Sequence, residues 1–528
     1  MGQIQINHLT FSYEGSYETI FEDMTVVLDT DWKLGLIGRN GRGKTTLLKL
    51  LLGEFSYEGK IVSSESFTYF PFQVEHKERD TIAIIEEMYP QYEFWEVCRE
   101  LQYLKVDLDC LYRPFQSLSQ GEQTKVLLAV LFLQEHSFLF IDEPTNHLDI
   151  EGREQVADYL KKKKGYILIS HDRAFLDRCV DHIMAINKKT IEIVKGNFTS
   201  WYENKCKKDA QEVQENERRK KEIKRLEKTI RQKENWANAI EKQKVGSGSV
   251  DRGYIGHKSA KMMKRGKVLE QRMGQEIERK KQLLQDVEEV EMLKMYPKRH
   301  YKQELIHIKN AEMKYGEVVV ADGINVAIQQ GNVYGIQGKN GCGKSTFLEC
   351  IRCLIRQKEE NNMEQGKKIS SLYEYLIREE RELGSQNLSF SCEQLELAKG
   401  ITVSYVPQDT SNLKGYLDDY IEQCGGDPTV FKMLLRKLDF SREHFEYPME
   451  SYSAGQKKKV LIARSLSEQA HLYIWDEPLN YIDLFSRIQI ETLIRESSLT
   501  MLLVEHDKTF LENVHAEEIS LSKEKKKK

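Results

Sequence analysis

GRNGRGKT, residues 38–45, is the stretch from which the fold class follows. It matches the P-loop pattern G-x-x-x-x-G-K-[S/T], whose glycines let backbone N–H groups wrap phosphates at the start of a helix. The apolar run 33–37 precedes it, and the run TLLKLL, residues 46–51, follows it. A strand, a phosphate-binding loop and a helix are therefore predicted, and together they indicate an α/β nucleotide-binding domain.

The pattern occurs a second time, as GKNGCGKS at residues 338–345. Three more motifs recur in the same order: LSQGE (118–122) as YSAGQ (452–456), IDEP (141–144) as WDEP (475–478), and HD (171–172) as HD (506–507). Ser119 lies 23 residues before Asp142, and Ser453 lies 23 residues before Asp476. Recurrence in one order and at matched spacing predicts two copies of one domain.

The motif residues carry a specific chemistry. Each P-loop is expected to place its lysine on the β- and γ-phosphates and its last hydroxyl on Mg²⁺, which assigns Lys44, Lys344, Thr45 and Ser345. Its other positions are predicted to bind nucleotide: Gly38, Asn40, Gly41, Gly43, Thr46, Gly338, Asn340, Gly341, Gly343 and Thr346. Asp142 and Asp476 end apolar runs and are expected to hold Mg²⁺. Glu143 and Glu477 are candidates to orient or deprotonate the attacking water. The alternative is that each Asp-Glu pair only caps a helix.

A basic segment separates the copies. Residues 203–300 contain 27 Lys+Arg and 17 Asp+Glu, whereas the whole chain has a formal charge of −4. Residues 203–242 have strong helix-forming composition, with Ile223, Leu226 and Ile230 on one face,. The sequence GSGS (246–249) breaks this helix, and a second one is expected from about 257 to 295, with Leu269, Met273 and Ile277 on its face,. A long antiparallel helical hairpin with its tip at about 242–268 is predicted.

These boundaries give four segments: residues 1–202 and 301–522 as the two nucleotide-binding domains, 203–300 as the hairpin, and 523–528 as a Lys-rich tail. Lys44 and Gln73 are 29 residues apart, but Lys344 and Gln408 are 64 apart. The second copy therefore holds an insertion, placed at about 356–399. No run approaches 18 uncharged apolar residues, so no membrane helix is expected. The nine cysteines form no framework, which indicates reduced thiols and a cytoplasmic protein,.

With these motifs the chain resembles the ABC (ATP-binding cassette) ATPases. Ser119-Gln-Gly121 and Ser453-Ala-Gly455 look like the signature loop of that family. The resemblance implies switch histidines at His171 and His506, Mg²⁺-linked Q-loop glutamines at Gln73 and Gln408, and adenine-stacking aromatics at Tyr13 and Tyr315. It further implies a monomer whose domains pair head to tail around two ATP molecules. Site one would combine the first P-loop with the second signature, and site two would combine the second P-loop with the first signature.

Tandem ABC domains joined by a charged helical hairpin resemble, more narrowly, the ABC-F translation factors. In that family the hairpin enters the exit-tRNA site of the ribosome, beside rRNA and the peptidyl-site tRNA, when ATP binds. The tip is basic, and phosphate attraction and base stacking assign it as an RNA-binding element: Lys242, Lys244, Arg252, Tyr254, His257, Lys258, Lys261, Lys264, Arg265 and Lys267. The tip sequence looks like members that dislodge lincosamides, streptogramin A and pleuromutilins.

Several alternatives stay open. The hairpin would bind nothing if it were only a solvated charged surface. Three other functions are alternatives to drug displacement: a housekeeping ABC-F factor that relieves stalled ribosomes, an ABC transporter ATPase subunit, and a DNA-repair ATPase. The signature residues Gln120 and Ala454 and the loop 480–483 depart from the usual pattern, which puts equal turnover at the two sites in doubt. Because both glutamates are present, two competent sites are predicted.

Overall fold

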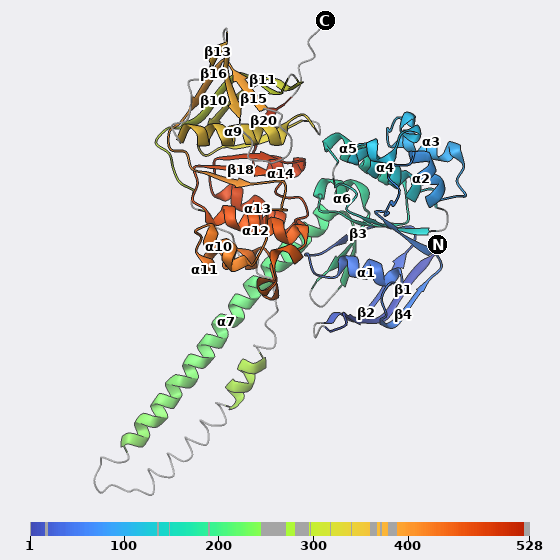
Figure 1. The fold of residues 1–528 in the computed structure, drawn as a ribbon. Helices are drawn as coiled ribbons and strands as arrows, with labels where there is room; N and C mark the ends of the chain where they lie inside the picture. Colours follow the sequence, from blue (N-terminus) through green and yellow to red (C-terminus); the bar gives the residue numbers. More distant parts are fainter. Residues whose placement is uncertain are drawn as a thin grey trace, which may run out of the picture. The chain divides into compact units, whose positions relative to one another are not determined.

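The computed structural model describes residues 2–15, 19–134, 137–146, 148–187, 191–243, 271–279, 295, 297–316, 318–338, 341–359, 367–369, 372–377 and 388–521. Of residues 233–243, 359, 367–369 and 372–377 it describes the backbone alone. The chain divides into two compact units, Met1–Thr199 with Glu291–Lys528, and Ser200–Val290. The first unit holds both copies of the repeat, and each copy contains one antiparallel sheet and one mainly parallel sheet (Figure 1).

The first copy is built on a six-stranded sheet of order β5-β6-β7-β3-β8-β9, in which only β8 and β9 pair antiparallel. Its central strands are buried apolar runs, as expected when helices cover both faces of a parallel sheet. The strands are β3 (Lys33–Ile37), β5 (Ser66–Phe70), β6 (Ser137–Asp142), β7 (Tyr166–Ile169), β8 (His182–Ile186) and β9 (Ile191–Lys195). The helices are α1 (Lys44–Leu51), α2 (Thr81–Met88), α3 (Phe94–Tyr103), α4 (Gln120–Leu131), α5 (Ile150–Lys162) and α6 (Arg173–Cys179).

The second copy repeats this plan with a five-stranded parallel sheet of order β17-β18-β19-β12-β20. Its strands are β12 (Val333–Gln337), β17 (Val403–Val406), β18 (Leu472–Asp476), β19 (Met501–Val504) and β20 (Glu517–Ser520). Its helices are α9 (Lys344–Glu359), α10 (Leu417–Gln423), α11 (Pro428–Lys437), α12 (Ala454–Ser467), α13 (Leu484–Glu496) and α14 (Lys508–Asn513). In both copies the P-loop lies between a central strand and the helix that follows it.

The antiparallel sheets differ in size because of the extra residues of the second copy. In the first copy the sheet order is β2-β1-β4, with strands β1 (Gln3–Ser12), β2 (Thr19–Asp29) and β4 (Glu58–Ser63). In the second the order is β11-β10-β15-β14-β13, with β16 also on β10. These strands are β10 (Glu304–Tyr315), β11 (Val318–Gln329), β13 (Lys367–Ile369), β14 (Leu372–Ile377), β15 (Leu388–Cys392) and β16 (Gln394–Leu397). Strands β13 and β14 lie in the predicted insertion and lengthen the sheet at its edge.

Between the copies runs α7 (Phe198–Gln243), a helix of 46 residues. At 1.5 Å per residue it is about 70 Å long. Of the face predicted from the sequence, Ile223 is buried and Leu226 and Ile230 are half-buried. Residues 271–279 are also helical, and Ile277 on them is buried. Among the helices of the described ranges, none is long and apolar enough to cross a membrane.

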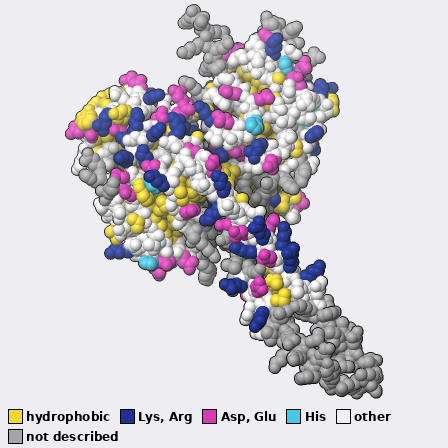
Figure 2. All heavy atoms as spheres, turned by 180° about the vertical axis from the view of Figure 1, so that it is seen from behind, with side chains coloured by type: hydrophobic (Ala, Val, Ile, Leu, Met, Phe, Trp, Pro, Cys, Tyr) yellow, Lys and Arg dark blue, Asp and Glu magenta, His cyan; other side chains and the backbone are white. Residues whose placement is uncertain are grey.

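Basic and acidic side chains gather along the described part of α7 (Figure 2). Up to Gln232 this helix carries 11 Lys+Arg and 7 Asp+Glu. The predicted tip lies outside the described residues, apart from the backbone of Lys242 and Gln243. The other predicted RNA contacts lie outside them too: Lys244, Arg252, Tyr254, His257, Lys258, Lys261, Lys264, Arg265 and Lys267. The tail 523–528 lies outside them as well.

Candidate active sites

The P-loops adopt a conformation that needs their glycines. Gly43 and Gly343 precede α1 and α9 with φ values of 83° and 93°. A Cβ on Gly43 would lie 2.6 Å from Ile20 Cγ2, and one on Gly343 would lie 2.5 Å from Val320 Cγ1. Both features exclude a larger residue. The backbone can therefore turn tightly into the helix, which is what a loop that wraps phosphates requires.

The P-loop lysines are buried and point into their own loops. Lys44 Nζ donates to the Gly38 carbonyl at 2.7 Å and to the Arg39 carbonyl at 3.1 Å, and Lys344 Nζ donates to the Gly338 carbonyl at 2.8 Å. Burial lowers the pKa of Lys44, while Asp483 and Glu143 oppose that shift. A buried ammonium at the centre of each loop provides the positive charge that a phosphate group needs.

Two carboxylates are placed to hold a metal ion. The Thr45 hydroxyl lies 3.4 Å from Asp142 Oδ2, and the Tyr69 hydroxyl donates to the same oxygen at 2.9 Å. Burial raises the pKa of Asp142, and it raises the pKa of Asp476 to about 6 against a hydrogen bond from Ser345. Asp476 Oδ1 has no hydrogen-bond partner among the described residues. A buried carboxylate oxygen without a donor, beside a hydroxyl, fits Mg²⁺.

The next residue in each copy is the candidate that orients water. Glu143 and Glu477 have φ values of 51° and 44°, a left-handed conformation that costs non-glycine residues roughly 1–3 kcal/mol and is concentrated at functional sites,. His171 Nε2 lies 3.5 Å from Glu143 Oε1, and His506 Nε2 lies 3.5 Å from Glu477 Oε1. The structure thus brings each predicted switch histidine to its predicted glutamate.

The surroundings of these two glutamates differ. Glu477 Oε2 accepts hydrogen bonds from Gln408 Nε2 at 2.8 Å and from Asn480 Nδ2 at 2.7 Å. Burial works against its ionisation, but hydrogen bonds from His506 and Gln408 hold its pKa below the usual value. Glu143 Oε1 has no hydrogen-bond partner within the described chain. Burial, together with the charge of Asp142, raises the pKa of Glu143 to about 8. Burial therefore favours the neutral form of Glu143, whereas its hydrogen bonds favour the ionised form of Glu477.

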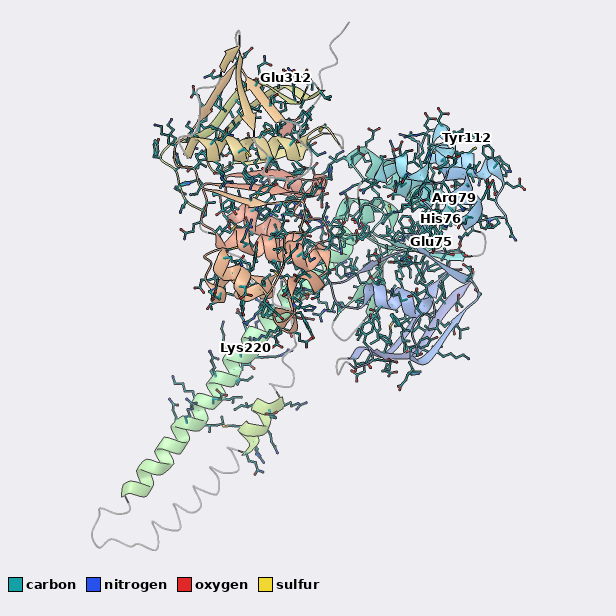
Figure 3. All side chains as sticks on the ribbon, in the orientation of Figure 1. Glu75, His76, Arg79, Tyr112, Lys220 and Glu312 are labelled. Carbon is teal, nitrogen blue, oxygen red and sulfur yellow. The ribbon has the colours of Figure 1, made fainter. Side chains whose placement is uncertain are left out.

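A one-residue difference in the Q-loops accompanies this contrast. Tyr69 pairs with Phe140 and Tyr405 with Ile474, each two residues before the strand-end aspartate. In this register Gln408 corresponds to Phe72, so Gln73 is displaced by one residue. Gln73 is exposed and makes no side-chain hydrogen bond among the described residues, and the chain continues along the surface through Glu75, His76 and Arg79 (Figure 3). The structure brings Gln408 to its glutamate but does not bring Gln73 to Glu143.

Site two is a cavity of about 850 Å³ lined by both copies. Such a volume suits a nucleotide-sized ligand. The second copy contributes Tyr315, Gly341, Gly343, Lys344, Ser345, Thr346, Gln408, Glu477 and His506, and the first contributes Ser119, Gln120 and Gly121. Ser119 caps α4 and Ser453 caps α12, each with a reciprocal capping box,. Of the residues predicted for site two, Gly338 and Asp476 do not line this cavity, and Asn340 lies outside the described residues.

Site one is closed by direct contacts between the copies. Asn40 Nδ2 donates to the Tyr481 carbonyl at 3.3 Å, and a Cβ on Gly455 would lie 2.5 Å from that same oxygen. The second signature therefore faces the first P-loop. Tyr13, which is 42 % exposed, bonds through its hydroxyl to Thr46 Oγ1 at 2.8 Å. Its ring is held edge-on by Phe11 and Phe55.

Ion pairs join the two copies around these sites. Lys508 Nζ lies 2.7 Å from Glu154 Oε1, and Arg39 Nη1 lies 3.7 Å from Asp439 Oδ1. Arg173 also pairs with Glu491. Tyr69, Asn480 and the contact through Tyr481 were absent from the sequence prediction. Tyr69 follows only from the register of β5 on β6, and Asn480 had a signal in the repeat because Asn146 occupies the equivalent position.

Both copies match one known family of proteins. The family described as ABC transporter matches residues 21–146 and 321–480. The ribosome protection protein VmlR of Bacillus subtilis is 27 % identical over 97 % of this chain and 85 % of its own length. ABC transporter F family member 2 of Arabidopsis thaliana is 25 % identical over 97 % of this chain and 75 % of its own. An archaeal ribosome recycling factor, aABCE1, solved with the stalk protein aP1, has a TM-score of 0.60 at 17 % identity, covering 98 % of this chain and 88 % of that one, which shows a shared fold.

Proposed function

Because the chain belongs to the ABC family, as an ABC-F ATPase with two ABC domains, we propose that it is a cytoplasmic, ribosome-binding ATPase that dislodges antibiotics from the peptidyl-transferase centre. In this proposal ATP binding draws the copies together, and the hairpin 203–300 enters the exit-tRNA site and contacts rRNA and the peptidyl-site tRNA. The carrying observation is the composite site two, in which signature and P-loop residues of different copies line one cavity. ATP can act there as a ligand shared by both copies.

The hydrolytic roles follow from the same geometry. Lys44 and Lys344 would hold the β- and γ-phosphates, and Glu143 and Glu477 would orient the water and accept its proton. Mg²⁺, when held by Thr45, Ser345, Asp142 and Asp476, would neutralise charge on the phosphates. Hydrolysis removes the γ-phosphate that both copies contact, so it releases the closed state.

Ribosome binding and drug displacement are supported by different observations. The basic linker, with its excess of 10 positive charges, complements RNA phosphates,. The drug-displacing role rests on similarity to VmlR, whose name describes ribosome protection. The decisive test is drug susceptibility of a host that expresses the intact chain or Glu143→Gln/Glu477→Gln. Equal susceptibility of the host to lincosamides, streptogramin A and pleuromutilins with and without the intact chain would exclude the resistance role and favour a housekeeping translation factor.

A further inference from the structure

The second copy contains a buried lysine beside its hydrolytic residues. Lys458 lies on α12, five residues after the cap Ser453, and its side chain is 2 % exposed. Its ammonium donates to the Pro407 carbonyl at 2.8 Å and to the Asp476 carbonyl at 3.3 Å. A buried ammonium is costly unless it is well paired. Burial lowers the pKa of Lys458 to about 8, and nearby carboxylates oppose that shift.

Both carbonyls belong to residues that directly precede predicted site residues. Pro407 precedes Gln408, and Asp476 precedes Glu477. Through these two hydrogen bonds, the Lys458 ammonium links the start of the Q-loop to the end of β18. The side chains of the two residues that follow these carbonyls are joined by a hydrogen bond, from Gln408 Nε2 to Glu477 Oε2 at 2.8 Å. Holding the two backbones at a fixed separation holds that hydrogen bond.

Lys458 also interacts electrostatically with a cluster of carboxylates. The carboxylates of Asp476, Glu505, Glu477 and Asp409 all act on its charge. Glu505 is 4 % exposed and accepts hydrogen bonds from the backbone N–H groups of Leu479 at 2.8 Å and His506 at 3.2 Å. The acid and the lysine thus brace the loops of Glu477 and His506 together.

The first copy provides an internal comparison. Thr124 stands where the second copy has Lys458, and Ser170 stands where it has Glu505. The Thr124 hydroxyl only donates to the Gln120 carbonyl of its own helix, at 2.9 Å. Without the lysine and with the displaced Gln73, Glu143 Oε1 is left with no hydrogen-bond partner within the described chain. The copy that lacks the lysine is thus also the copy whose glutamate receives no hydrogen bond from its Q-loop glutamine among the described residues.

We infer that Lys458 is a positioning residue of the second copy, which acts through Gln408 and the strand end to hold Glu477 in the orientation that hydrolysis requires. In that reaction the water oxygen bonds to the γ-phosphorus while the bond from phosphorus to the β–γ bridging oxygen breaks. A water proton passes to the glutamate, and ADP and phosphate leave. Lys458 touches neither the nucleotide nor the water. Lys458 affects only the position and the orientation of the Glu477 carboxylate.

The test uses the full chain with Glu143→Gln as the parent, so that hydrolysis comes from the second copy. Lys458→Met keeps the length of the side chain and removes the charge. We expect kcat to fall at least tenfold, while the dissociation constant of a fluorescent ATP analogue stays within threefold. The matched control is Lys457→Thr, on the preceding residue of the same helix, which should retain parental kcat. A kcat within twofold of the parent, or a dissociation constant that rises in proportion to the loss of kcat, overturns the inference.

A second variant separates positioning from folding. Lys458→Thr/Glu505→Ser copies the first copy and removes both buried ionisable groups, and its urea midpoint, measured beside that of the parent, reports any loss of folding. This double variant should hydrolyse at least tenfold more slowly, because the tie between Pro407 and Asp476 is gone. Recovery of the parental rate would show that Lys458 only neutralises Glu505, and would overturn the positioning role.

Discussion

Asn40 of the first P-loop donates a hydrogen bond to the main-chain carbonyl of Tyr481, which lies in the second copy between its Asp-Glu pair and α13. The loop that carries Tyr481 also carries Asn480, whose amide donates to Glu477. One short loop therefore touches the phosphate-binding loop of site one and the glutamate of site two. Events at one site have a direct structural route to the other.

This contact predicts the effect of adding one methyl group. Gly455→Ala would place a Cβ 2.5 Å from the Tyr481 carbonyl oxygen. In the Glu143→Gln/Glu477→Gln background, we expect retained ATP to fall from two molecules per chain to one, measured after gel filtration. Gly426→Ala is the control, because its nearest neighbour would lie 3.7 Å away. Retention of two ATP molecules by Gly455→Ala contradicts the assignment of site one.

The environments of the two glutamates predict unequal turnover. Hydrogen bonds hold the pKa of Glu477 below its usual value, whereas burial and Asp142 raise the pKa of Glu143 to about 8. Glu477→Gln should therefore remove most steady-state hydrolysis, and Glu143→Gln should remove the smaller part. The rate left in Glu477→Gln should rise as the pH increases from 7 to 9, since Glu143 loses its proton over that interval. Equal losses from the two variants would disprove the asymmetry.

Ribosome binding predicts a trapped complex. Glu143→Gln/Glu477→Gln with ATP should co-sediment with ribosomes, because closure is retained when hydrolysis is blocked. Adding Lys44→Ala and Lys344→Ala removes the phosphate-binding ammonium groups and should abolish co-sedimentation. Association that persists without ATP, or that resists ribonuclease treatment, would speak against ATP-gated RNA binding.

A buried carboxylate on α3 predicts a pH-dependent stability. Glu100, 1 % exposed, accepts hydrogen bonds from Tyr159 and Lys163, both at 2.6 Å. Burial opposes ionisation, but these bonds hold the pKa of Glu100 below its usual value. The stabilisation is therefore complete above the unfolded-state pKa and is lost as pH falls through the lower folded-state pKa.

Glu100→Gln should lower the free energy of unfolding by roughly 3 kcal/mol at pH 7, the cost of breaking a buried ion pair. The difference from the parent should shrink only once the pH falls below the unfolded-state pKa of 4.5. Urea unfolding at several pH values measures it, with the exposed Glu93→Gln as the control. A pH-independent difference would show that Glu100 acts through packing alone.

The positions of residues that belong to local motifs could be predicted from the sequence. The P-loops, the Asp-Glu pairs and the histidines lie where their patterns predict, since a strand-loop-helix unit is encoded within about 20 residues. Tyr69, Lys458 and the displacement of Gln73 could not be predicted, because each depends on which strands are neighbours and in what register. A lysine in the sequence KKKV, residues 457–460, gives no sign that it will be buried.

The capping boxes have a consequence for nucleotide affinity. The Ser119 hydroxyl donates to Glu122 Oε2 at 2.8 Å and receives the Glu122 N–H at 3.2 Å. A serine that turned toward a γ-phosphate would leave that carboxylate and open the first turn of α4, at a cost of about 1 kcal/mol. In the second copy the equivalent residue is the neutral Gln456, whose backbone N–H donates to the Ser453 hydroxyl. Ligand binding and helix-end fraying are thus thermodynamically linked, and the linkage is stronger at site two, where an anionic side chain competes with the nucleotide for one hydroxyl.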